Sequence, residues 1–188
     1  MPPLGIGFIG SGFNARFHML AFQGVRDANV LGVWSPNAKH AAEGAATARR
    51  LDIGKARPYA SISEMVADPA IDAIWLCGAN HARIENIEEM VDPIMRGQAE
   101  LRGVACEKPL ARNVAEAKRV TELVKRAGVA HGYLENQVFA PPVEQARRCF
   151  GDEAPRPLGD PTSLERPKSI AVPTLPGSGR ASYRAAAS

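Results

Sequence analysis

Short apolar runs alternate along this chain with longer segments that carry helix signals. The apolar runs cover residues 4–9, 29–34, the neighbourhood of Tyr59, 71–78, 101–109 and 129–134. The helix signals, which are apolar spacing or capping patterns, mark residues 14–24, 38–51, a segment opening at Ser61, 86–96 and 113–126. Apolar strands that are joined through helices form parallel sheets with right-handed crossovers. The order therefore predicts an α/β fold with a doubly wound, mostly parallel sheet of six strands.

Residues at three positions predict where helices start, kink or end within these segments. Ser61, followed three residues later by Glu64, is a capping box that starts a helix. Pro93 is expected to kink the segment 86–96 or to divide it, because proline lacks the N–H that a helix interior needs. Gly128 is expected to end the helix before it, since glycine readily adopts the left-handed turn found at helix ends.

Composition argues against several classes of protein. Of the 188 residues, 45% are hydrophobic and 23% are charged, which is ordinary for a soluble domain. The net charge of +3 comes without a block of Lys and Arg, so we expect no nucleic-acid partner. No apolar run approaches the roughly 18 residues of a membrane span, so we expect no membrane association. Cys77, Cys106 and Cys149 form no Cys-x-x-Cys pair, which indicates reduced thiols in a cytoplasmic protein and no metal site.

The chain changes character after Phe150. Residues 151–188 hold six prolines and four glycines and show neither strand nor helix periodicity. Such a segment buries too little apolar surface to offset the entropy of ordering. We therefore expect a disordered tail.

The glycine-rich stretch after the first apolar run has the pattern of a dinucleotide-binding turn of the Rossmann type. It reads GSGFNA from Gly10 to Ala15, or G-x-G-x-x-A, between a predicted strand and a predicted helix. Gly10 permits a tight turn, Gly12 lets a pyrophosphate approach the backbone, and Ala15 lets the helix pack closely on the strand. The N–H groups of the first helical turn, which includes Phe13 and Asn14, would bind the phosphates. The alternative is a plain strand–helix turn.

The residue that would contact the adenosine ribose lies about 20 residues further on, at the end of the second strand. This stretch offers Ser35, Asn37 and Lys39 and contains no carboxylate. A carboxylate would repel the 2′-phosphate of NADP, whereas a hydroxyl and a lysine would not. We therefore expect NADP or NAD as the cofactor, with NADP preferred. The alternative is that these residues are solvated and only start a helix.

A second candidate motif, Glu107-Lys108-Pro109, ends the fifth predicted strand. Ligands of doubly wound sheets bind outside the carboxyl ends of the strands, so this motif falls on the same rim as Gly10 and Gly12. Lys108 can donate a hydrogen bond to a substrate hydroxyl and exchange its proton. The alternative is an ordinary loop with a surface lysine.

Three stretches carry a resemblance to a known family. GIGFIGSGFNARFH, EKPLARNVAEA and GYLENQVFAPPV resemble the glucose–fructose oxidoreductase / inositol dehydrogenase / rhizopine-catabolism family of NAD(P)-dependent oxidoreductases, over residues 4–145. The resemblance implies that Glu107-Lys108-Pro109 is the family signature at the cofactor site. It further implies that Lys108 is the catalytic or substrate-orienting residue and that Pro109 shapes the bend beside the nicotinamide.

The same resemblance implies roles for further residues, and for others the role stays open. The turn at Gly78 and Asn80 is implied to touch the cofactor, and Asn136 to lie near the nicotinamide and the substrate. His81 follows Asn80, and ligand contact and a solvated loop are equally open for it. For His18, on the first predicted helix, packing is favoured over catalysis.

The sequence departs from the family pattern at two positions and in its last part. Arg83 stands where many relatives have histidine, and Val138 where arginine is common. Relatives place an Asp-x-x-x-His acid/base pair in a second, α+β substrate domain, and this chain has no histidine after His131. The expected organisation is a cofactor-binding domain at 1–141, the start of a lost second domain at 142–150, and a disordered or out-of-frame tail at 151–188.

The predicted function is hydride transfer between a nicotinamide cofactor and a hydroxyl- or carbonyl-bearing carbon of a sugar or cyclitol. This small-molecule substrate is the expected partner. Without the second domain, we expect the chain alone to be inactive, and apolar positions at 142–150 to favour self-association. The alternative is a non-catalytic nucleotide-binding or interaction protein.

Overall fold

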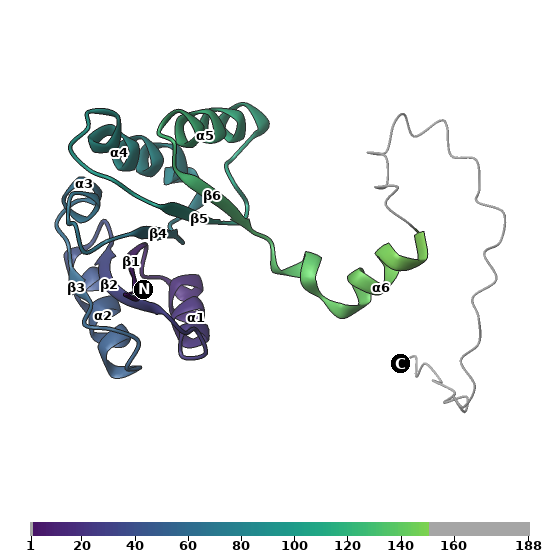
Figure 1. Cartoon of the computed structure of the whole chain (residues 1–188), viewed down its shortest axis with the longest axis horizontal. Coiled ribbons are helices and arrows are strands. Elements are labelled where there is room, and N and C mark those ends of the chain that lie inside the picture. Colours follow the sequence, from purple (N-terminus) through teal and green to yellow (C-terminus); the bar gives the residue numbers. More distant parts are fainter. Residues whose placement is uncertain (1, 151–188) are drawn as a thin grey trace, which may run out of the picture. The chain divides into compact units, whose positions relative to one another are not determined.

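One sheet of six strands organises the molecule (Figure 1). In the computed structural model, which describes residues 2–150, the strands lie in the order β3-β2-β1-β4-β5-β6. Their bounds are β1 Leu4–Ile9, β2 Ala28–Trp34, β3 Arg57–Pro58, β4 Ala73–Leu76, β5 Gly103–Glu107 and β6 Ala130–Leu134. The predicted doubly wound sheet of six strands is confirmed, and every pairing among the described strands is parallel.

Helices connect the successive strands. They are α1 Phe13–Phe22, α2 Ala38–Arg50, α3 Ile62–Val66, α4 Arg83–Met95 and α5 Val114–Arg126, with short helices η1 Asn80–Ala82 and η2 Asn136–Phe139. Residues up to Ala140 form one compact unit, and α6 Pro141–Phe150 belongs to a second. None of the helices within residues 2–150 is long and apolar enough to span a bilayer. The tail predicted at 151–188 lies outside the described residues.

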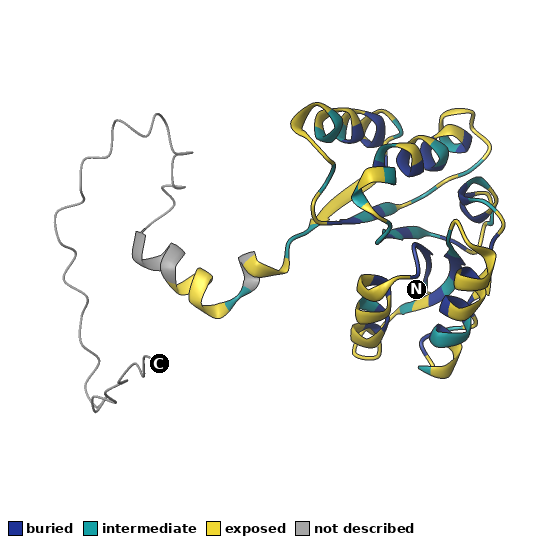
Figure 2. Cartoon of the chain, turned by 180° about the vertical axis from the view of Figure 1, so that it is seen from behind, coloured by how far each residue is buried: buried dark blue, intermediate teal, exposed yellow. Residues whose placement is uncertain are grey.

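Alternation along the central strands builds two apolar layers. In β1, Ile6 and Phe8 pack with α1 and α2, whereas Ile9 packs with α3, α4 and α5 on the other face of the sheet. Trp75 of β4 joins the first layer and meets Phe22 of α1 edge-on, with 5.1 Å between ring centroids. Figure 2 shows the buried positions along the strands and on the helix sides that face them. Both faces of the sheet are therefore covered, as parallel sheets require.

The strand order reverses at β1, which pairs with β2 on one side and with β4 on the other. The pairing continues past the strand ends, because Gly10 N–H donates to the Trp34 carbonyl at 2.8 Å and Cys77 N–H to the Ile9 carbonyl at 2.9 Å. Chains leaving β1 and β4 turn to opposite faces of the sheet, which opens a crevice between them. The candidate site lies at this edge.

The segment that contains Pro93 forms one helix, α4, so the expectation that this proline could divide it is wrong. Pro93 lacks the N–H that would bond the carbonyl of Glu89, four residues earlier. The Ser63 hydroxyl of α3 donates to that carbonyl at 3.3 Å. In return, the Glu89 carboxylate accepts from the N–H groups of Ile62 and Ser63 at 2.9 and 3.3 Å. The two helices thus satisfy backbone groups of one another.

The predicted cap of α3 is confirmed in its main contact. The Ser61 hydroxyl oxygen accepts from the Glu64 N–H at 3.0 Å. The Glu64 carboxylate accepts from the N–H of Ala60 at 2.9 Å, one residue earlier than a capping box predicts. Gly128, with a φ of 68°, follows the end of α5 as expected.

Replacing Ser63 by alanine is expected to lower the free energy of unfolding by about 1 kcal/mol, since it removes the donor to the Glu89 carbonyl. In a Pro93→Ala background the loss should shrink, because alanine at this position restores an N–H within the helix. Urea unfolding of the four proteins measures this coupling. Equal losses in both backgrounds would contradict the shared acceptor.

Candidate functional site

The turn after β1 depends on Gly10. Its φ is 102°, a conformation that residues with a side chain rarely adopt. A Cβ at this position would also lie 2.8 Å from the backbone nitrogen of Gly78, in the loop that follows β4. Gly10 therefore lets the turn after β1 and the loop after β4 pack against each other. Ala15, at the start of α1, is fully buried against the sheet.

Gly12 is the N-cap of α1 and faces open space. A Cβ placed on it meets no described atom within 4 Å. The first N–H groups of α1 have no partner inside the helix and carry the positive end of its dipole. The first turn contains no acidic residue in its sequence. This turn therefore presents backbone donors that fit a pyrophosphate.

A cleft of about 360 Å³ opens beside this turn, where β1, β4 and β5 end. Segments far apart in the sequence line it: residues 12–14, residues 77–80 with Arg83, and residues 107–109. The cleft gathers many of the residues that the sequence analysis singled out. These are Gly12, Phe13, Asn14, Gly78, Asn80, Glu107, Lys108 and Pro109.

The other predicted residues do not line this cleft. Ser35, Asn37 and Lys39 follow β2, and the Asn37 side chain caps α2 by accepting from the Lys39 N–H at 2.9 Å. His81 lies in η1 and Asn136 in η2. Asn37 thus has a structural task at a helix start, which is the alternative that the sequence left open for this stretch.

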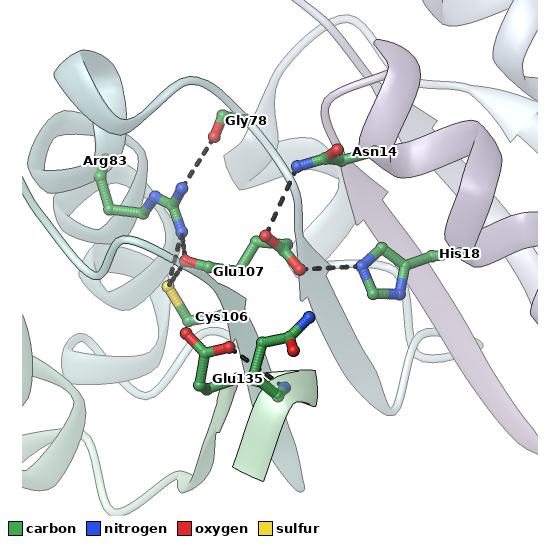
Figure 3. Close-up of polar contacts among 8 residues, drawn as sticks. Asn14, His18, Gly78, Arg83, Cys106, Glu107 and Glu135 are labelled. Carbon is green, nitrogen blue, oxygen red and sulfur yellow. Dashed lines mark hydrogen bonds and ion pairs between the residues drawn. The ribbon is translucent and has the colours of Figure 1, made fainter. Parts of the chain in front are cut away.

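Arg83, at the start of α4, lines the cleft with only 2% of its surface exposed. One guanidinium nitrogen donates to the Gly78 carbonyl at 2.9 Å, and the other donates to the Glu107 carbonyl and to the Cys106 sulfur (Figure 3). One side chain thereby links the ends of β4 and β5. From the sequence, Arg83 was notable only as a departure from the family pattern, because these contacts are tertiary.

The Glu107 side chain extends toward α1 (Figure 3). Its oxygens lie 3.5 Å from the amide nitrogen of Asn14 and 3.1 Å from Nε2 of His18. Because a carboxylate only accepts, Asn14 and His18 are the donors. The His18 ring also packs edge-on against Trp75, with 6.1 Å between centroids. The ring contact agrees with the packing role that the sequence favoured for His18, but the contact with Glu107 was not predicted, since this partner is 89 positions away.

Two thiols near this network are poor nucleophiles. Burial, together with the negative charge of Glu107, raises the pKa of Cys77 to about 12. Burial also raises the pKa of Cys106, and neither cysteine forms a disulfide. Within residues 2–150, no group of three His, Cys, Asp or Glu side chains could hold a metal ion. The cleft therefore offers backbone donors, a lysine and a held carboxylate.

The sheet and the crevice at its switch point define a protein of the Rossmann class. The chain belongs to the oxidoreductase family with an NAD-binding Rossmann fold, whose sequence profile matches residues 4–133. It is 30% identical over 126 residues to a 1,5-anhydro-D-fructose reductase of Ensifer adhaerens. It is 29% identical over 159 residues to levoglucosan dehydrogenase of Pseudarthrobacter phenanthrenivorans. The myo-inositol dehydrogenase of Lactobacillus casei, solved with NAD(H) and myo-inositol, shares the fold with a TM-score of 0.66 at 20% identity.

These matches cover most of this chain and a smaller part of each relative. They span 67%, 82% and 79% of the chain, but only 34% of the reductase, 38% of levoglucosan dehydrogenase and 41% of inositol dehydrogenase. The family resemblance seen in the sequence is confirmed. The activities in these names belong to longer chains.

The Cys77 thiol is expected to react with iodoacetamide at pH 8 at least about tenfold more slowly than an unperturbed thiol, because its raised pKa suppresses the thiolate by more than the higher reactivity of that thiolate restores. Mass spectrometry of the labelled peptide over time measures the rate. In urea, where burial is lost, the same peptide should react at the ordinary rate. Rapid labelling of the folded protein would show that Cys77 is not buried as described.

Proposed function

We propose that this chain binds a nicotinamide dinucleotide, NADP or NAD, in the cleft at the ends of β1, β4 and β5. The observation that carries the proposal is the meeting of the open turn at Gly12 with Lys108 around one cleft. The turn supplies donors for a pyrophosphate, and the lysine lies on the same rim. Membership of a family with an NAD-binding Rossmann fold supports this assignment.

The topology of the sheet supports one placement of the two halves of the dinucleotide. With the pyrophosphate over Gly12 at the switch point, one mononucleotide half would lie over β2 and β3 and the other over β4 and β5. In this fold the adenosine ribose binds at the end of the second strand, so we expect the nicotinamide half at the ends of β4 and β5. There it would meet the turn at Gly78 and Asn80, and the bend at Lys108 and Pro109.

The proposed reaction is hydride transfer between the bound cofactor and a carbon that carries a hydroxyl or carbonyl group. The nicotinamide supplies or accepts the hydride when bound. Lys108 would donate a hydrogen bond to the substrate oxygen and act on its proton as a general acid or base. The sugar-type substrates in the names of the relatives support a sugar or cyclitol.

We infer a preference for NADP over NAD from the residues that follow β2. Ser35 is partly buried at the end of the strand, and Lys39 is exposed in the first turn of α2. The start of α2 contains no acidic residue in its sequence, and its dipole places positive charge there. A 2′-phosphate would therefore meet a hydroxyl, a lysine and a helix N-terminus rather than a carboxylate.

Replacing Gly12 by valine should weaken cofactor binding at least about tenfold, or about 1.4 kcal/mol. The space around its Cβ is open, so the side chain enters the cleft without disturbing the fold. Titration calorimetry with NADP⁺ and NAD⁺ measures the dissociation constants. Gly132→Val in β6 is the matched control, since a Cβ there also meets no described atom within 4 Å. Unchanged affinity in a folded Gly12 variant refutes the proposed site.

The wild type is expected to bind NADP⁺ more tightly than NAD⁺, and Ser35→Asp should move the ratio toward NAD⁺. An aspartate at this position repels the 2′-phosphate. In Ser35→Asn the new side chain has nearly the size of aspartate but no charge, so this variant should leave the ratio of the two dissociation constants close to that of the wild type. If the wild type has an NAD⁺ dissociation constant equal to or below that of NADP⁺, the proposed preference for NADP⁺ is refuted.

A further inference from the structure

Both the backbone carbonyl and the side-chain carboxylate of Glu107 are hydrogen-bonded to other residues (Figure 3). Its backbone carbonyl accepts from the Arg83 guanidinium, and its carboxylate accepts from His18 at 3.1 Å and from Asn14 at 3.5 Å. Arg83 belongs to α4 on one face of the sheet, and His18 belongs to α1 on the other. The residue directly before Lys108 is therefore fixed from both faces.

The buried guanidinium sets the spacing of two turns. Its nitrogens lie in a rigid planar fork. Because Arg83 donates hydrogen bonds to the carbonyls of both Gly78 and Glu107, the fork fixes how far apart the ends of β4 and β5 lie. Its Nε is buried and has no partner among the described residues. Any rotation of the side chain would leave further buried donors unpaired, which makes the arrangement stiff.

The contact with His18 ties the same residue to the helix that starts at Gly12. The side chains of His18 and Glu107 are only 21% and 10% exposed, so water competes for their hydrogen bond less than it does at the surface. The imidazole is also fixed in direction, because its ring packs against Trp75. The turn at Lys108 is thereby held in register with the first turn of α1.

We propose that His18 and Arg83 are positioning residues for the nicotinamide half of the cofactor. They act through Glu107, which they hold, and so place Lys108 and Pro109 against the turns at Gly12 and Gly78. This inference rests on the proposed dinucleotide function and adds which residues shape one half of the site. The hydrogen bonds and ring contacts of both residues within the described part of the chain involve no residue of β2 or β3, over which the adenosine half would lie.

The test compares the dissociation constant of each dinucleotide with that of the same molecule without its nicotinamide ring. The pairs are NAD⁺ with ADP-ribose and NADP⁺ with 2′-phospho-ADP-ribose.

The variants change the contact with Glu107. His18→Phe keeps a ring against Trp75 and removes the donor to Glu107. His18→Gln keeps an amide donor. His131→Phe is the control, because His131 lies in β6, where its ring contacts only the carbonyl of nearby Val129 among the described hydrogen bonds. Calorimetry gives the dissociation constants, and thermal unfolding confirms that each variant is folded.

For His18→Phe we expect the dinucleotide that the wild type prefers to bind about fivefold more weakly or worse, because a site has to be held within about 0.5 Å of its productive geometry. The ring-less fragment should stay within about twofold of the wild type. His18→Gln should restore dinucleotide binding, and His131→Phe should not change it. Equal losses for dinucleotide and fragment, or no loss at all, would overturn the positioning role.

Arg83→Lys tests the other end of Glu107. One ammonium cannot reproduce the fork that joins two carbonyls, so a folded Arg83→Lys variant should show the same selective loss of the dinucleotide. If this variant does not fold, the His18 variants decide the inference by themselves. A wild type that binds neither probe overturns the proposed function, and the inference with it, whereas binding of both probes with an unselective His18→Phe overturns the inference alone.

Discussion

The close passage of the turn after β1 against the loop after β4 is the contact on which the site depends. Gly10 adopts a φ of 102°, and a Cβ there would come within 2.8 Å of the Gly78 backbone. Any side chain would separate the two loops and, with them, two walls of the cleft. Because β1 is paired on both sides, the loops cannot shift without breaking the ladder that continues into Cys77. The backbone geometry of one glycine therefore sets the geometry of the crevice.

The second constraint is a cation buried at the same edge. A guanidinium away from water is stable only when its donors find acceptors. The two terminal nitrogens of Arg83 find two carbonyls and a sulfur, all neutral, at the ends of β4 and β5, and only its Nε lacks a partner among the described residues. The nearby carboxylate of Glu107 extends instead toward His18 and Asn14 of α1. Arg83, Glu107 and His18 thus form a short chain of contacts across the sheet, and Lys108 follows directly after its central residue.

Local patterns predicted the elements because each pattern reports on its own neighbourhood. The cap at Ser61 and the stop at Gly128 appear where the residue types place them. Pro93 shows where such reasoning ends. A proline deprives the Glu89 carbonyl of its helical donor, but Ser63 on another helix supplies a new one, so α4 continues through it. A helix boundary that depends on a neighbouring element cannot be read from the helix alone.

The sequence by itself determined the order of strands and helices, the turn at Gly10 and Gly12, and the position of Lys108 on the same rim. These follow from periodicity, from the φ that glycine permits and from the rule that parallel strands end at one edge. Only the tertiary structure decided that Arg83 joins two strand ends and that His18 meets Glu107. Local periodicity shows which side of an element is buried, but the side chain that it meets depends on how distant elements pack. For that reason the backbone of the site was predictable, and the contacts that hold it were not.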